Sequence, residues 1–142
     1  MLRSRLTGEM VQFIPRAKNW EEAIRMASEP LLKHGYIEAG YVDAMISNVK
    51  ELGPYIVLMP RVAMPHARPE DGVRKMGISL LITEDAVLFE GGKSANAFFV
   101  VAAEDATSHL TLLQEISDLL SDEEKITKLL GAGTYEDLLN LL

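Results

Sequence analysis

Cysteine is absent from the 142 residues of the sequence, and no apolar run approaches the roughly 20 residues that cross a bilayer. Without cysteine the chain has no disulfide framework, no thiolate nucleophile and no cysteine zinc site. The start, MLRSRLTGEM, is basic but lacks the continuous apolar segment and the small-residue cleavage site of a signal peptide. We therefore expect a cytoplasmic protein with no segment inserted in the membrane.

Positive charge is also scarce, with 14 Lys and Arg against 21 Asp and Glu and a net charge of −7. The basic residues cluster only in the stretch RVAMPHARPEDGVRK, at 61–75. Nucleic-acid binding normally needs a basic face, so we expect no nucleic-acid partner. An acidic surface is compatible instead with a basic protein partner.

No linker, low-complexity tract or internal repeat divides the chain, so we expect one domain over residues 1–142. Apolar residues recur at helical spacing in 19–35, in 40–53 and from about His109 onward. Three short apolar runs are typical of buried strands: YIVLM at 55–59, GISLLIT at 77–83 and AFFVVAA at 97–103. Continuously apolar strands indicate a sheet covered on both faces, so the sequence predicts an α/β sandwich with a helical C-terminal part.

Cap and breaker residues predict where the helices begin and end. Pro30 lies inside the first helical segment, so we expect a kink or a change of helix there. Gly35 and Gly53 are expected to end the first and second helical segments. Three polar residues with an acidic residue three positions later are predicted N-terminal caps: Asn19 with Glu22, Ser121 with Glu124, and Thr134 with Asp137.

Histidine is rare, with three in the chain. His34 precedes Gly35 at a predicted helix end, which favours a capping or surface role. His66 lies in VAMPHARPEDGV, directly after a predicted strand, where Pro65 and Pro69 stiffen the backbone. An imidazole held in this way has little entropy to lose when it reacts, which favours transfer chemistry.

His109 lies in EDATSHL, at the expected N-terminus of a helix that follows a buried strand. Thr107 or Ser108 is the expected cap, and the free amides of a first helical turn attract anions. The residues alone leave two interpretations open. His66 and His109 form a joint site, or both are structural histidines of a binding module.

Several catalytic motifs are missing. The sequence has no HExxH or similar metal-ligand spacing, no G-x-S-x-G elbow, no P-loop and no G-x-G-x-x-G loop. This argues against a metal hydrolase, and we expect no bound metal and no cofactor. What remains is an imidazole acting as nucleophile or acid/base beside Arg61, Arg68, helix amides and a second histidine. That set suits a phosphoryl group, whose negative oxygens need donors while the nitrogen attacks in line.

At this point the residues resemble a known family. The segment GPYIVLMPRVAMPHARPEDGV, with DATSHL downstream, resembles the IIA component of the sugar phosphotransferase system (PTS) in its mannitol/fructose class. The G-P-Y lead into A-M-P-H-x-R-P-E-x-G-V is most similar to the L-ascorbate branch. The resemblance covers nearly the whole chain, including NWEEAI, GYIEAGYVDAM and the helical tail.

The resemblance implies a phosphocarrier, which is a protein-histidine phosphotransferase with a transient phosphohistidine. His66 would take a phosphoryl group on Nε2 from the phosphohistidine of the carrier HPr. It would pass that group to a cysteine of the cognate IIB component, which serves sugar entering through the membrane component IIC. His109 would orient the phosphoryl oxygens. The implied fold is a mixed, mostly parallel sheet with helices on both faces.

One position departs from the family pattern. Mannitol-type members place an arginine at the position aligned with Asn48, whose amide can donate hydrogen bonds but carries no charge. We expect Arg68, on the turn of His66, or Arg61 to compensate, with Ser108 as a further stabilising candidate. The alternative function is a regulatory, nitrogen-type IIA domain that controls a partner protein. The sugar stays open among ascorbate, a pentitol and a related acid sugar.

Overall fold

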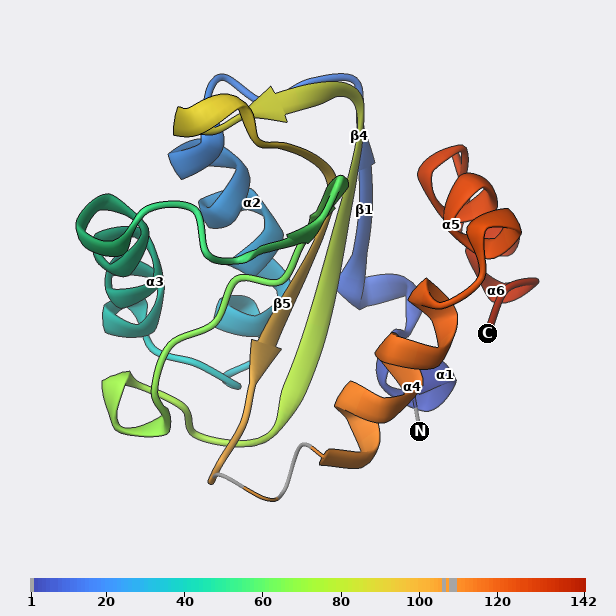
Figure 1. The fold of residues 1–142 in the computed structure, drawn as a ribbon. Helices are drawn as coiled ribbons and strands as arrows, with labels where there is room; N and C mark the ends of the chain where they lie inside the picture. The colour runs from blue at the N-terminus through green and yellow to red at the C-terminus, as the bar shows by residue number, and fades with distance from the viewer. Residues whose placement is uncertain (1, 106, 108–109) are drawn as a thin grey trace.

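The computed structural model describes residues 2–105, 107 and 110–142, which form a five-stranded sheet between two layers of helices (Figure 1). The strands are β1 Val11–Ile14, β2 Val57–Met59, β3 Arg61–Ala63, β4 Gly77–Leu88 and β5 Ser94–Ala102. The α-helices are α1 Leu2–Arg5, α2 Trp20–Lys33, α3 Ala39–Leu52, α4 Leu110–Leu120, α5 Glu123–Leu130 and α6 Tyr135–Leu139. Three 3-10 turns complete the described elements: η1 Gly8–Met10, η2 Pro69–Asp71 and η3 Glu90–Gly92.

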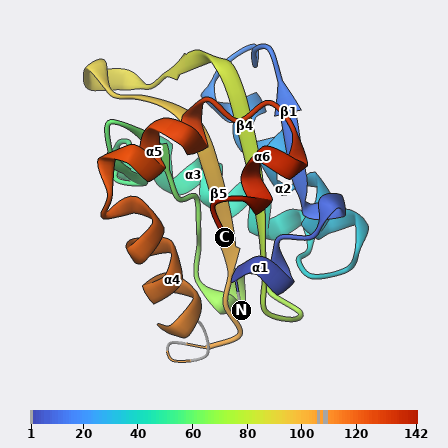
Figure 2. The same cartoon turned by 90° about the vertical axis from the view of Figure 1, so that its right-hand side faces the viewer.

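The sheet has the strand order β1-β4-β5-β3-β2. β1 and β4 pair in parallel, as do β3 and β5, whereas β4/β5 and β2/β3 are antiparallel. Helices α2 and α3 cover one face, and α1, α4, α5 and α6 cover the other (Figure 1, Figure 2). The predicted α/β class and the mixed sheet between helices are confirmed, with parallel and antiparallel pairs in equal number. No helix in the described ranges is long and apolar enough to cross a membrane.

The central strands explain why the apolar runs predict them well. From Ala95 to Ala102 every residue of β5 is buried, and β4 is buried from Gly77 to Thr83, because helices lie on both faces. The edge of the sheet is different. β2 was expected to be a buried strand over 55–59, and that prediction is wrong. β2 is an edge strand whose Leu58 is exposed, since it pairs with β3 on one side alone.

Helix α2 runs through Pro30 without ending. The predicted change of helix there is wrong, and the reason lies in β1, a short strand that no sequence pattern predicts. Proline lacks the N–H that would bond the carbonyl of Met26, four residues earlier. The Nε2 amide of Gln12, on β1, donates to that carbonyl at 2.6 Å instead. A side chain from the sheet thus replaces the missing helical hydrogen bond.

The predicted caps are confirmed at two of three helices. The side chains of Asn19 and Thr134 accept the backbone N–H three residues onward, at 2.9 and 3.2 Å. At α5 the prediction of Ser121 is wrong, because Asp122 caps the helix by accepting the N–H of Glu124 at 2.8 Å. The hydroxyl of Ser121 donates to a carbonyl of the preceding helix instead.

Candidate functional site

The turn that follows β3 carries His66 and is held by backbone hydrogen bonds on both sides. The N–H of Met64 donates to the carbonyl of Ile56 at 2.9 Å. On the other side, the N–H of Val101 on β5 donates to the carbonyl of Pro65 at 3.1 Å. The backbone that presents His66 is therefore fixed against β5 and against the segment that leads into β2.

The imidazole of His66 is half-buried, and one of its ring nitrogens is occupied. Nδ1 lies 2.8 Å from the carbonyl oxygen of Met64. Because a carbonyl only accepts, this contact assigns the hydrogen to Nδ1 and leaves the lone pair of the neutral ring on Nε2. The ring of Tyr55 meets the imidazole edge to face, at 5.8 Å between centroids and an interplanar angle of 87°. These two contacts fix the tautomer and the orientation of the ring.

Tyr41, in the first turn of α3, connects three parts of the site. Its hydroxyl donates to the carbonyl of Val101 at 2.6 Å and accepts the N–H of Ala67 at 3.0 Å. The side chain is 1% exposed, and this burial raises the pKa of Tyr41 to about 12, an effect that the hydrogen bond to Ala67 partly opposes. The neutral phenol therefore ties the residue after His66 to both α3 and β5.

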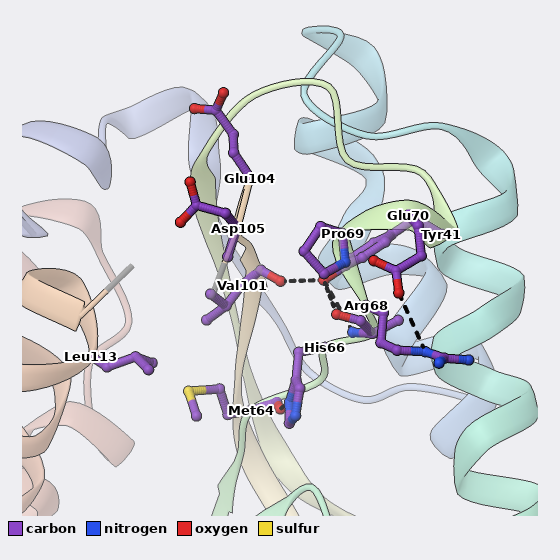
Figure 3. Close-up of a pocket in the computed structure, with 12 residues that line it drawn as sticks. Tyr41, Met64, His66, Arg68, Pro69, Glu70, Val101, Glu104, Asp105 and Leu113 are labelled. Atoms are coloured by element: carbon purple, nitrogen blue, oxygen red, sulfur yellow. Dashed lines mark hydrogen bonds and ion pairs between the residues drawn. The ribbon is translucent and has the colours of Figure 1, made fainter. Parts of the chain in front are cut away.

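A pocket of about 510 Å³ opens beside His66, between its turn and the end of β5 (Figure 3). Met64 and Leu113 lie on one side of the imidazole, and Arg68 lies on the other (Figure 3). Charged side chains of both signs line it: Arg68, Glu70, Glu104 and Asp105. The hollow leaves room for a small group beside the imidazole. In the described part of the chain, no group of three or more His, Asp or Glu side chains could hold a metal ion.

Arg68 combines a fixed backbone with an exposed guanidinium. Its N–H donates to Oδ2 of Asp71 at 3.1 Å, which holds the start of η2. Its Nε lies 3.9 Å from Oε1 of Glu70, and the two side chains are 80% and 69% exposed. An ion pair this exposed contributes little free energy and exchanges readily. The guanidinium can therefore turn to an anion in the pocket at small cost.

Arg61 is engaged elsewhere. Its Nε donates to Oδ1 of Asn96 at 3.1 Å, and its backbone φ is 73°. Asn96 is buried, and its Nδ2 donates to the carbonyls of Thr83 and Glu84, both at 3.1 Å. Arg61 thus belongs to the junction of β3, β4 and β5, and it is not among the described residues that line the pocket.

The structure brings His66 and Arg68 to one pocket, as the sequence predicts. Asn48 is half-buried on α3 and, like Arg61, is absent from the described lining of that pocket. Ser108 and His109 lie outside the described residues.

Tyr41 is the site residue that the sequence patterns missed. It lies four positions before Met45, on the apolar stripe of α3, so periodicity marks it as a core residue and nothing more. A buried tyrosine nevertheless has to find a partner for its hydroxyl. The need for a hydrogen-bond partner was the signal that the sequence offered for Tyr41. It does not identify which group bonds the hydroxyl.

The family model "Phosphoenolpyruvate-dependent sugar phosphotransferase system, EIIA 2" matches residues 4–142. The chain belongs to this family. It is a PTS EIIA component, a phosphotransferase that carries its phosphoryl group on a histidine. The predicted family and carrier function are therefore confirmed at the level of the mannitol/fructose class.

Relatives of two sugar specificities resemble this EIIA chain. The mannitol-specific cryptic phosphotransferase enzyme IIA component of Escherichia coli K12 is 38% identical over 133 residues, covering 93% of this chain and 90% of the relative. The ascorbate-specific PTS system EIIA component of the same strain is 33% identical over 138 residues, covering 95% and 90%. These identities support the class and do not single out the ascorbate branch.

Solved structures agree with the fold of this EIIA chain. The solution structure of the Escherichia coli mannitol-specific cryptic IIA superposes with a TM-score of 0.91 at 37% identity, covering 99% of this chain and 96% of that one. The Escherichia coli complex of mannitol IIA with phosphorylated mannitol IIB gives 0.81 at 30% identity, covering 96% and 95%.

Proposed function

We propose that His66 is the residue that carries the phosphoryl group and that Nε2 is the attacking atom. The observation that carries this proposal is the hydrogen bond of Nδ1 to the carbonyl of Met64 at 2.8 Å. In the neutral ring this hydrogen bond places the lone pair on Nε2, which lies beside the pocket.

The transfer forms one N–P bond as it breaks another, so atoms and charge balance. The Nε2 lone pair forms the new N–P bond, and the electrons of the donor's P–N bond return to the donor nitrogen. His66 then keeps its hydrogen on Nδ1, and the carbonyl of Met64 stabilises the positive charge that develops on the ring. In the onward step the thiolate of the IIB cysteine forms a new S–P bond, the Nε2–P bond breaks and its electrons return to Nε2, so no cofactor takes part.

Arg68 is the phosphoryl-stabilising residue that we retain among the predicted candidates. It lines the pocket, and its exposed pair with Glu70 is readily exchanged for a phosphoryl oxygen. The three carboxylates at the same pocket, those of Glu70, Glu104 and Asp105, would oppose an excess of negative charge. A site with both signs of charge suits a carrier, because binding the phosphoryl group too tightly would trap it. The orienting role of His109 is also a proposal, and it rests on the family resemblance.

The proposed partners are phospho-HPr as donor and a cysteine of the cognate IIB component as acceptor, with the membrane component IIC reached indirectly through IIB. The complex of an Escherichia coli relative with phosphorylated IIB supports the second of these. The net charge of −7 would speed encounters with basic partner surfaces. We place this relay in the cytoplasm.

We propose L-ascorbate or a related acid sugar as the sugar of the system, on the pattern GPY…AMPHARPE. Mannitol is the second candidate, because the mannitol-specific cryptic relative has the higher identity, 38% against 33%. Phosphoryl transfer from the labelled protein to purified ascorbate-type IIB and mannitol-type IIB separates the two. Transfer to neither would favour the regulatory, nitrogen-type alternative.

The test of the carrier residue uses enzyme I, HPr and phosphoenolpyruvate with wild type, His66→Gln and His109→Gln. Intact mass, followed by acid and alkali treatment, reports the label. We expect one acid-labile, alkali-stable phosphoryl group on wild type and on His109→Gln, with slower uptake in the latter, and none on His66→Gln. A label that persists on folded His66→Gln, checked by circular dichroism, would overturn the assignment.

A further inference from the structure

A second pocket, of about 330 Å³, lies between the N-terminal segment, the end of α2 and the start of β4. Helix α1 lies at the lower end of the sheet in Figure 2, on the same side as the N-terminus. The pocket shares none of its described lining residues with the pocket of His66. The two pockets are therefore separate sites on the molecule.

The charge of this second pocket is opposite to that of the chain. Its lining includes Arg5, Lys75 and His34, against the single carboxylate of Glu9 among its described residues. Nε2 of His34 lies 3.6 Å from Oε2 of Glu9. A local positive site is unusual on a molecule with a net charge of −7, and it concentrates anions there.

Arg5 has hydrogen-bonding capacity to spare. Its Nη1 donates to the carbonyl of Met76 at 3.1 Å, which fixes the guanidinium at the pocket. Its Nε is buried and has no acceptor among the described residues. This Nε is closed to solvent and therefore also to a ligand in the pocket, so the guanidinium would bind an anion through its terminal nitrogens. Guanidinium suits an oxyanion best, because its donors form a fork that matches two oxygens.

Lys75 is held at the pocket by Tyr36. Its Nζ lies 4.3 Å from the centroid of the Tyr36 ring, which is the distance of a cation–π contact. The ring in turn lies close over Gly77, where an added Cβ would come within 2.5 Å of Cδ2 of Tyr36. The glycine thus lets the ring approach β4, and the ring places the ammonium. The second cation is ordered before any ligand arrives.

We propose that this pocket binds the phosphate group of a small molecule, either inorganic phosphate or a phosphate monoester. The guanidinium of Arg5 and the ammonium of Lys75 neutralise the two negative charges, and the hydroxyl of Thr7 and the imidazole of His34 complete the donors. The pocket is open and has room for an organic group beyond the phosphate. This site is independent of the carrier chemistry at His66.

The experiment is a titration of the full chain, followed by the amide NMR signals of Thr7, Gly8 and Gly77 at constant ionic strength. Inorganic phosphate and glucose 6-phosphate are the two probes. Both should saturate these signals if the phosphate group suffices, and only the second should do so if the organic group is needed. The signal of Ala67 reports separately on the pocket of His66, and it should not follow the saturation curve of Thr7, Gly8 and Gly77.

Lys75→Gln and Arg5→Gln should each raise the dissociation constant at least tenfold. Arg16→Gln is the matched control, because Arg16 is exposed and pairs with Asp85 outside the pocket. Lys75 is exposed, so its variant keeps the test valid if Arg5→Gln fails to fold. Shifts that do not saturate, or that all three variants show equally, would overturn the site. His66→Gln should bind the probes as wild type does, so failure here leaves the carrier proposal intact.

Discussion

Two tyrosines contact the His66 turn, one from the core and one from the surface. Tyr41 is buried and uses its hydroxyl to hold the carbonyl of Val101 and the N–H of Ala67. Tyr55 is 39% exposed and meets the imidazole with its ring alone. One residue therefore positions the backbone through an oxygen atom, and the other positions the side chain through shape. The same amino acid has two roles here, and the two can be separated by removing only the hydroxyl.

The largest expected effect concerns the titration of Tyr41. Its pKa is raised from 10.0 to about 12, so the folded state favours the neutral phenol. This contribution to the free energy of unfolding is fully present below the pKa of Tyr41 in the unfolded state. It is lost as the pH rises through the pKa of Tyr41 in the folded state. We expect wild type to lose roughly 3 kcal/mol between these limits in urea unfolding, in excess of the loss in Tyr41→Phe. Parallel pH profiles of the two proteins would contradict the burial argument.

Tyr41→Phe also has an effect at neutral pH. It keeps the ring but removes the hydroxyl that pairs with the buried carbonyl of Val101 and the partly buried N–H of Ala67, which costs about 1–3 kcal/mol of the free energy of unfolding. Because the turn of His66 loosens, phosphoryl uptake should slow by about tenfold. Tyr55→Phe is the matched control and should change neither quantity. A destabilised Tyr41→Phe with wild-type uptake would limit the hydroxyl to stability.

Arg68→Gln should separate chemistry from stability on the outer side of the turn. Its ion pair with Glu70 is exposed, so the free energy of unfolding should change by less than about 0.5 kcal/mol. Loss of the charge should slow phosphoryl uptake by about tenfold, and Arg68→Lys should recover part of it. Initial rates with limiting phospho-HPr measure this effect. Equal rates for Arg68→Gln and wild type would remove Arg68 from the site.

The smallest expected effect is that of Tyr55→Ala. An edge-to-face pair contributes about 0.5–1.5 kcal/mol, so freeing the imidazole should slow uptake by about twofold to tenfold. The comparison with Tyr55→Phe, which keeps the ring, isolates the shape contribution. If Tyr55→Ala and Tyr55→Phe behave alike, the ring contact does not position His66.

Local signals predicted much of this fold from the sequence. Periodicity and caps marked α2, α3 and α6, because an amphipathic helix and its first turn are encoded within a few residues. The predicted change of helix at Pro30 was wrong because the replacement hydrogen bond comes from Gln12, which lies outside the helix in the sequence. β1 was missed because four residues with a polar side chain among them carry little strand signal.

The candidate site also has features that local sequence predicts and features that depend on distant residues. His66 and Arg68 share one rigid turn, so their proximity follows from the sequence. Arg61 lies five positions before His66, but its side chain turns to Asn96, and only the register of β3 and β5 decides that direction. The sequence could not identify the hydrogen-bond partner of His66 Nδ1 either, because that partner is a backbone carbonyl and every residue has one.

The hydrogen bonds that hold the His66 turn have a consequence for how the carrier becomes active. They join residues near positions 41, 56, 65 and 101, which come together only when α3, the turn after β3 and β5 pack against one another. A nascent or clipped chain that ends before Val101 lacks part of this set, so we expect it to hold His66 on a looser turn and to accept phosphoryl groups more slowly. The rate of phosphoryl uptake is thus a readout of how well α3 and β5 are packed around the turn of His66.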